Sequence, residues 1–138
     1  MSLQDRVKEA VNWDTPSIDG ESSLHQAISQ MVKYDVSAFV VKMNGIVAGI
    51  LGCVDLIKSV ITHQDLHAVK VAEVMTSCQL VTEEGAVNPC AQIDEDESVE
   101  NALKVLDSMG THNLLVAGST EREAGLVSLR DLLGLAIK

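Results

Sequence analysis

The stretch Gly125-Leu126-Val127-Ser128-Leu129-Arg130-Asp131, close to the C-terminus, decides the fold. It is typical of a buried strand that ends at a hydroxyl-bearing turn, with an acidic residue where a helix opens. A helix start offers unpaired backbone N–H groups and the positive end of the helix dipole, which favour an anion. We expect Ser128 to donate a hydrogen bond there and Arg130 to add positive charge. The Asp131 carboxylate suits two neighbouring hydroxyls, which is what a ribose offers.

The same pattern occurs a second time, as Gly49-Ile50-Leu51-Gly52-Cys53-Val54-Asp55, with Gly and Asp at the same spacing. Residues 18–41 align with residues 93–116 at a constant offset of 75. Residues 7–11 align with residues 71–75 at an offset of 64, so the second copy carries 11 extra residues between its first segment and its first full helix. The chain is therefore an internal duplication, and each copy has too little core to be secure alone.

Each copy is predicted to run strand, helix, strand, strand, helix. Apolar residues of the first helix recur at i, i+3, i+4 and i+7, which indicates one buried stripe. Ser23 and Ser98 precede these stripes and are candidate helix caps. Asn44-Gly45 predicts a hairpin turn, because both residues tolerate positive φ. The two stripes are Leu24, Ala27, Ile28, Met31 and Val99, Ala102, Leu103, Leu106.

Composition excludes several classes of function. Hydrophobic residues make up 46% of the 138 residues and aromatic residues 2%, so the core is aliphatic and base-stacking platforms are disfavoured. A formal charge of −10 repels nucleic acid and anionic lipid. No apolar run approaches the roughly 18 residues of a membrane span, and no signal-peptide pattern opens the chain. Three cysteines without metal-ligand spacing favour a reducing, cytoplasmic location.

Three motifs in order carry a family resemblance: Val71-Ala72-Glu73-Val74-Met75-Thr76, then Ala102-Leu103, then the stretch from Gly125 to Asp131. With the duplication, they make the chain resemble a tandem pair of cystathionine-β-synthase-type (CBS) domains, a Bateman module. The resemblance implies an α/β fold, mixed α+β in detail. It comprises two pseudo-symmetric repeats, each a small sheet packed with two helices. We place the repeats at residues 1–66 and 67–138, with an inserted loop near residues 79–92.

The resemblance implies regulatory ligand binding rather than catalysis, with no required cofactor. Candidate ligands are AMP, ADP, ATP and S-adenosylmethionine. Asp131 would hold the ribose hydroxyls, Ser128 would meet the phosphate or the ribose edge, and Arg130 would neutralise phosphate. The adenine would lie near His112, Asn113 and Leu114. The resemblance also implies a homodimer formed through the helices, and a separate regulated protein as partner.

The first copy departs from the family pattern. Gly52 stands where Ser or Thr is usual, and Val54 stands where a basic residue is common. Asp55 remains, so a ribose would still find an acceptor, but a phosphate would lose a donor and a charge. We therefore expect one competent site in the second copy and one degenerate site in the first.

Plain structural roles compete with these assignments at the second motif. Asp131 or Ser128 would serve as a helix N-cap, and Arg130 would pair with Glu121 or Glu123. His112 is expected to be a half-exposed residue at a strand edge. Close strand–helix packing explains Gly49 and Gly125.

Two further residues have structural alternatives of their own. Cys53 follows an apolar strand and is interpreted as a packed small hydrophobe. Trp13 is assigned either to packing at the start of the first repeat or to a partner surface.

Three functions remain in competition. The first is a nucleotide sensor that signals to a separate protein, with its site in the second copy. The second is a ligand-free dimerisation or interaction module, which the degenerate first copy and the insertion near the cleft favour. The third, an enzyme or redox protein using a cysteine, is remote, because no catalytic motif is present. No metal is assigned, since the histidines and cysteines lack ligand spacing.

Overall fold

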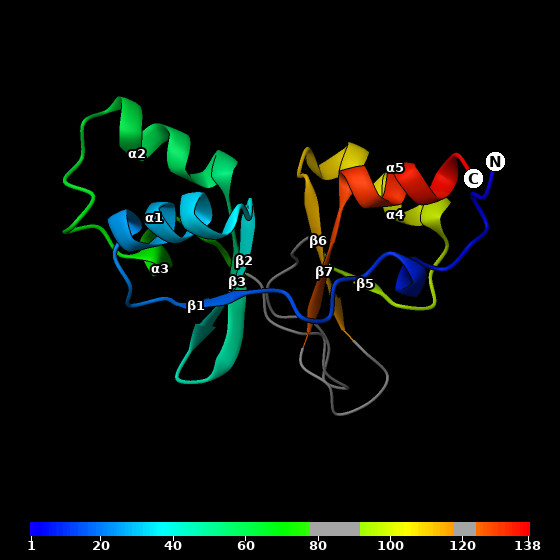
Figure 1. Ribbon diagram of the computed structural model, residues 1–138, viewed down its shortest axis with the longest axis horizontal. Helices are drawn as coiled ribbons and strands as arrows, with labels where there is room; N and C mark the ends of the chain where they lie inside the picture. The colour runs from blue at the N-terminus through cyan, green and yellow to red at the C-terminus, as the bar shows by residue number, and fades with distance from the viewer. Residues whose placement is uncertain (78–91, 118–123) are drawn as a thin grey trace. The chain divides into compact units, whose positions relative to one another are not determined.

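The structure is a computed structural model that describes residues 1–77, 92–117 and 124–138 (Figure 1). Three expectations lie outside these residues: the loop near 79–92, any Cys78–Cys90 pairing, and ion pairs from Arg130 to Glu121 or Glu123. The chain divides into two compact units. Unit 1 combines Met1–Thr15 with Ala91–Lys138, and unit 2 is Pro16–Cys90. The fold is mixed α+β, as predicted.

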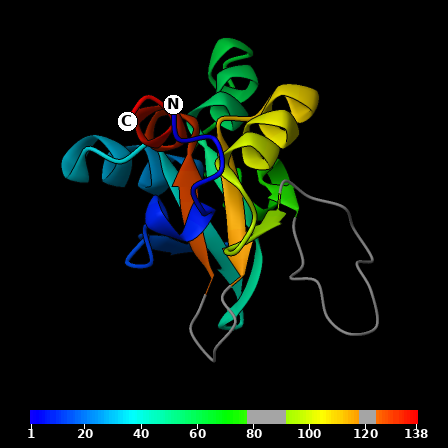
Figure 2. The same cartoon turned by 90° about the vertical axis from the view of Figure 1, so that its right-hand side faces the viewer.

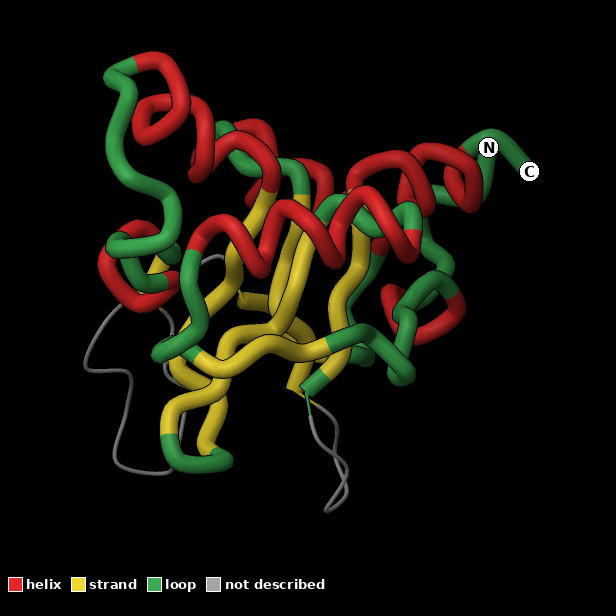
Figure 3. Tube along the Cα trace, turned by 60° about the vertical axis from the view of Figure 1, so that its left-hand side comes forward, coloured by secondary structure: helices red, strands yellow, loops and turns green. Residues whose placement is uncertain are grey.

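Unit 2 is a sheet with helices packed on it (Figure 3). Strand order is β1-β2-β3-β4, with β1 parallel to β2 and the other pairs antiparallel. Positive φ at Asn44 (54°) and Gly45 (79°) confirms the predicted hairpin turn. The elements are β1 (Ser17–Asp19), α1 (Leu24–Tyr34), β2 (Ala38–Met43), β3 (Ile46–Gly52), the 3₁₀ helix η2 (Cys53–Leu56), α2 (Ile57–Ile61), α3 (Val71–Val74) and β4 (Thr76–Ser77).

The core of unit 2 lies between α1 and the sheet. Leu24, Ala27 and Met31 of the predicted stripe are buried against Phe39 and Leu51 of the strands. Ser23 caps α1, because its Oγ accepts a hydrogen bond from the Gln26 N–H at 3.1 Å. The amphipathic period therefore identifies the buried face correctly.

Unit 1 repeats this plan in the order β5-β6-β7, parallel and then antiparallel. Ser98 caps α4 by accepting from the Asn101 N–H at 3.2 Å. Both termini lie in this unit, where the Ser2 N–H donates to the Ala136 carbonyl at 2.7 Å (Figure 2). The elements are the 3₁₀ helix η1 (Val7–Glu9), β5 (Gln92–Asp94), α4 (Val99–Met109), β6 (Asn113–Ala117), β7 (Gly125–Ser128) and α5 (Leu129–Ala136).

Each repeat begins with a leading segment, around residues 6–13 in the first repeat and residues 70–77 in the second. Each leading segment packs on the body of the other repeat. Arg6 forms a β-bridge with Ser98, and the equivalent Lys70 forms one with Ser23. Lys70 Nζ also donates to Glu21 Oε2 at 2.6 Å, and this hydrogen bond, aided by the charge of Glu21, raises the pKa of Lys70. The units therefore differ from contiguous halves divided at residues 66 and 67, because the leading segments are exchanged.

Two glycines permit this exchange. A Cβ on Gly125 would lie 2.8 Å from the Asn12 carbonyl oxygen, and a Cβ on Gly49 would collide with the Thr76 carbonyl oxygen. The predicted packing partner, a helix, is wrong: the neighbour is the extended leading segment. Trp13 belongs to this segment and packs against the core of unit 1, on the body of the second repeat.

Candidate functional site

The predicted site in the second copy is built where β7 passes into α5. Ser128 is the N-cap of α5, and its Oγ accepts a hydrogen bond from the Asp131 N–H at 3.1 Å. Asp131 is therefore not the cap but a residue of the first helical turn. The hydroxyl proton of Ser128 is still available for donation, because a hydroxyl accepts and donates at once. The turn is fixed further by the Leu129 N–H, which donates to the His112 carbonyl at 2.8 Å.

The two charged side chains of this turn, Arg130 and Asp131, are exposed. Within the described ranges, neither the Arg130 guanidinium nor the Asp131 carboxylate forms a hydrogen bond or an ion pair with another side chain. Both line a groove of about 540 Å³ between α5 and the end of η1. Glu9 and Lys138 line the same groove, and sequence analysis did not single them out. The offset of 64 placed Glu9 in the leading segment, but nothing local indicated that this segment folds against α5.

The expected adenine contacts lie beside this turn in different environments. Asn113 pairs with Ser128 in the antiparallel register of β6 and β7, so the two predicted residues are neighbours. His112 precedes β6 and is exposed. Leu114 is completely buried and belongs to the core of unit 1. Its side chain is therefore committed to packing, which leaves only its backbone for the predicted role.

The equivalent carboxylate in the first copy, that of Asp55, already accepts hydrogen bonds from the protein. Asp55 Oδ2 accepts a hydrogen bond from the Gly52 N–H at 2.8 Å. Asp55 Oδ1 accepts from the Thr76 hydroxyl at 3.3 Å. Both oxygens therefore have partners inside unit 2, and Gly52 supplies no hydroxyl for a ligand. The degenerate first site stays a prediction.

The residue equivalent to Thr76 behaves differently in unit 1. The offset of 64 aligns Asn12 with Thr76, and both pair with the strand that precedes the motif. The Asn12 side chain, however, accepts from the Asp14 N–H at 3.0 Å and so is committed to its own turn. Among the described residues, Asp131 has no counterpart of the Thr76 hydroxyl. Sequence analysis quoted Thr76 only as part of a family motif and missed this contact.

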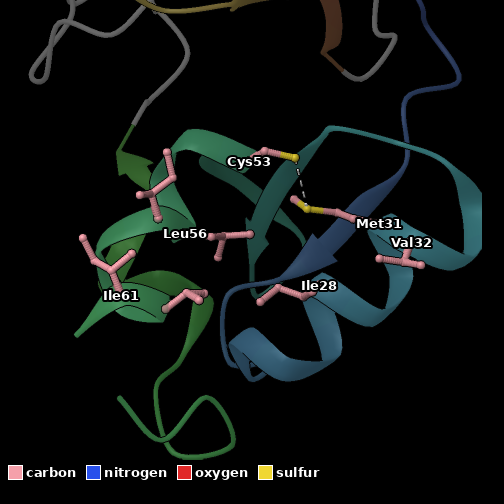
Figure 4. Close-up of a pocket in the computed structure, with 8 residues that line it drawn as sticks. Ile28, Met31, Val32, Cys53, Leu56 and Ile61 are labelled. Atoms are coloured by element: carbon pink, nitrogen blue, oxygen red, sulfur yellow. Dashed lines mark hydrogen bonds between the residues drawn. The ribbon is translucent and has the colours of Figure 1, made fainter. Parts of the chain in front are cut away.

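A second hollow lies between α1 and α2 of unit 2, and it is apolar (Figure 4). Its volume is about 380 Å³, and its lining includes Ile28, Leu56 and Ile61. Cys53 also lines it, with its Sγ 3.8 Å from Met31 Sδ. Cys53 is exposed, so the interpretation as a packed small residue is wrong.

The described residues contain neither a metal-binding group of side chains nor a membrane-spanning helix. No group of three or more His, Cys, Asp or Glu side chains in those ranges is arranged to hold a metal ion. None of the helices in those ranges is long and apolar enough to cross a membrane.

The two copies of the internal duplication each match the same family of known proteins. Residues 7–62 and 71–138 each match the family model of the CBS domain. No curated protein matches the chain significantly.

Solved structures share the fold at low identity. A conserved CBS domain protein of unknown function from Thermoplasma acidophilum matches with TM-score 0.80 and 21% identity over 94% of this chain and 68% of its own. An uncharacterized conserved protein from Pyrococcus horikoshii matches with TM-score 0.79 and 19% identity over 100% and 96%. The CBS domain of a bacterial CNNM/CorC family Mg²⁺ transporter, solved in complex with ATP, matches with TM-score 0.74 and 19% identity over 98% and 89%.

Proposed function

Because the chain belongs to the CBS domain family, with domains at residues 7–62 and 71–138, we propose that it is a non-catalytic regulatory module that binds an adenosine-containing ligand. The ligand binds at the β7–α5 turn of unit 1, and its level is transmitted to a separate protein. One observation carries the proposal: within the described residues Asp131 and Arg130 are uncommitted beside a groove, whereas both carboxylate oxygens of Asp55 accept hydrogen bonds. The ATP complex of a CNNM/CorC CBS domain supports the ligand class.

Each residue of the turn has a distinct task in this proposal. The Asp131 carboxylate accepts hydrogen bonds from the two ribose hydroxyls. Ser128 donates its hydroxyl proton to a phosphate or to the ribose edge, and Arg130 pairs with phosphate. The start of α5 adds the positive end of its dipole. These local charges favour an anion although the whole chain carries −10.

The proposal includes one ligand per chain and a homodimer. Ligand binding shifts the module between states only if the states differ in affinity. The α5 turn is suited to this role, because it joins the sheet of unit 1 to a helix whose outer side chains are exposed. A partner protein would sense such a shift on the helical surface.

The alternative is a ligand-free interaction module. The occupied Asp55 and the apolar hollow of unit 2 favour it, since both describe a domain suited to packing rather than to small-molecule binding. The two functions differ in one measurable respect, which is whether an adenosine compound binds at all.

Isothermal titration of AMP, ADP, ATP and S-adenosylmethionine separates them. We expect one ligand per chain for at least one compound. Asp131→Ala removes charge-assisted hydrogen bonds of about 1.5–3 kcal/mol, so affinity should fall by about 10- to 150-fold.

Asp55→Ala is the matched control, because the same residue type is removed from the equivalent turn, and it should leave affinity unchanged. Absence of heat and of thermal stabilisation with all four compounds would establish the ligand-free alternative.

A further inference from the structure

The groove beside the Ser128–Asp131 turn continues along α5, beyond the residues that the motif supplies. Its two sides are α5 and the end of η1, which both belong to unit 1 (Figure 1). The residues on the α5 side recur at i, i+1, i+4, i+5 and i+8, so they share one face of the helix. They are Arg130, Asp131, Gly134, Leu135 and Lys138. At a rise of about 1.5 Å per residue, this face extends for about 12 Å along the helix axis, which is more than a ribose at Asp131 requires.

Gly134 leaves the middle of this groove open. A Cβ at this position would meet no atom of the described residues within 4 Å, apart from the local helix backbone. Close packing therefore does not require a glycine here, in contrast to Gly49 and Gly125. Glycine also destabilises a helix interior relative to alanine. A ligand that lies lengthwise along α5 gives the residue a purpose, because it can approach the helix backbone only where no side chain intervenes.

The two ends of the groove each carry a cation. Arg130 lies at the end next to β7, and Lys138 lies at the far end and is exposed. Within residues 1–77, 92–117 and 124–138, the Lys138 ammonium forms no hydrogen bond or ion pair with another side chain. An ammonium without a partner beside a polar groove attracts an anionic group. The second cation is therefore suited to an anion that lies well away from the ribose.

Glu9 contributes a negative charge to the side of the groove that the leading segment forms. Its Oε2 accepts a hydrogen bond from the Arg6 N–H at 3.2 Å, which holds the carboxylate near the end of η1. A carboxylate at this place repels a phosphate and attracts a sulfonium or an ammonium group. Glu9 therefore distinguishes between two kinds of 5′ extension, a polyphosphate and the methionine part of S-adenosylmethionine.

We propose that the groove between Asp131 and Lys138 holds the 5′ extension of the adenosine ligand, and that an anionic group at the end of this extension pairs with Lys138. AMP carries its single phosphate directly on the ribose, so this phosphate stays at the Arg130 end. ADP, ATP and S-adenosylmethionine carry a terminal phosphate or carboxylate several bonds further away. The site therefore selects adenosine compounds with a long 5′ extension over AMP. This inference rests on the proposed function and adds which ligands are preferred and which residue selects them.

Isothermal titration of AMP, ADP, ATP and S-adenosylmethionine into the wild type and two variants tests the selection. We expect the wild type to bind at least one of the three longer compounds about tenfold more tightly than AMP, because one more charge-assisted hydrogen bond forms. Lys138→Gln should reduce this preference to less than about threefold, since it removes that hydrogen bond. Gly134→Leu fills the middle of the groove and should reduce the preference similarly, and leucine favours the helix more than glycine does.

Two further variants complete the experiment. Lys104→Gln is the matched control, because it removes the same charge from an exposed position on α4 that does not line the groove, and it should leave the preference unchanged. Glu9→Gln identifies the extension: binding should become about threefold tighter if the preferred ligand is ADP or ATP, and about threefold weaker if it is S-adenosylmethionine. An unchanged affinity for the preferred ligand would mean that the extension does not pass Glu9, which contradicts the proposed path.

The failure of this inference and the failure of the proposed function give different results. Equal wild-type affinities for AMP and the longer compounds would overturn the selection and leave adenosine binding in place. The same conclusion follows if Lys138→Gln lowers the thermal unfolding temperature but keeps the preference, since Lys138 would then only stabilise the C-terminal end of α5. Absence of binding for all four compounds would remove the proposed function and the extension site together.

Discussion

The Gly52–Asp55 turn of unit 2 and the Ser128–Asp131 turn of unit 1 occupy equivalent places in the two repeats, and their aspartates have different environments. Asp55 accepts hydrogen bonds at both carboxylate oxygens, from the Gly52 N–H and the Thr76 hydroxyl. Asp131 keeps its carboxylate uncommitted within the described residues, where Ser128 supplies the cap of the helix. The same residue at the same position is thus structural in one repeat and available for a ligand in the other.

The difference teaches that the leading segment acts together with the motif's own Gly52 N–H on the availability of the aspartate. Thr76 and Asn12 align with each other and pair with equivalent strands. Thr76 extends its hydroxyl to Asp55, whereas Asn12 accepts from its own turn at Asp14. A residue from outside the motif therefore adds a second hydrogen bond to Asp55, and the described residues hold no equivalent donor for Asp131.

The largest expected effect tests the packing that the two regions share. Gly49→Ala and Gly125→Ala each drive a methyl group into the backbone of the leading segment. We expect each to lower the free energy of unfolding by about 1–3 kcal/mol, measured by urea denaturation. Gly134→Ala is the control, because a Cβ there meets open space within a helix, and it should raise stability by up to about 1 kcal/mol.

Unequal losses between the two glycine variants would sharpen the comparison, because they would show which leading segment is held more tightly. Wild-type stability in both variants would contradict the close approach of the segments. That result would also remove the basis for the difference between Thr76 and Asn12.

An effect of comparable size separates the two aspartates without any ligand. Asp55→Ala removes an acceptor of two hydrogen bonds and should cost about 1.5–3 kcal/mol of unfolding free energy. Asp131→Ala removes only a favourable charge at a helix start and should cost less than about 1 kcal/mol. The same urea denaturation experiment measures both variants. Equal costs would break the comparison, since they would mean that the two carboxylates are equally engaged.

The local features of the fold were predictable from the sequence. The hairpin at Asn44-Gly45, the caps at Ser23 and Ser98 and the buried stripe of α1 depend on φ preference, side-chain hydrogen bonding and helical period. Each of these acts within a few residues of the chain. The alignment of the two copies was also correct, because the β-bridges of Arg6 and Lys70 are formed at equivalent positions.

Long-range choices were not predictable. No local pattern shows that residues 7–15 pack on the second repeat, or that the Thr76 hydroxyl reaches Asp55 across 21 residues of sequence. The exposure of Cys53 was not predictable either, because the apolar strand that precedes it predicts a packed residue. The Leu114 side chain is completely buried in the core, so the adenine contact predicted there stays a prediction for its backbone groups.

The central claim is that the Ser128–Asp131 turn binds the ligand and the Gly52–Asp55 turn does not. The most direct measurement follows the backbone amide signals of ¹⁵N-labelled protein during titration with AMP and, separately, with ATP. We predict that the signals of Leu129, Arg130 and Asp131 shift and saturate at one equivalent, while those of Cys53, Val54 and Asp55 stay in place. Equal shifts at both turns, or shifts at the first turn alone, would contradict the account.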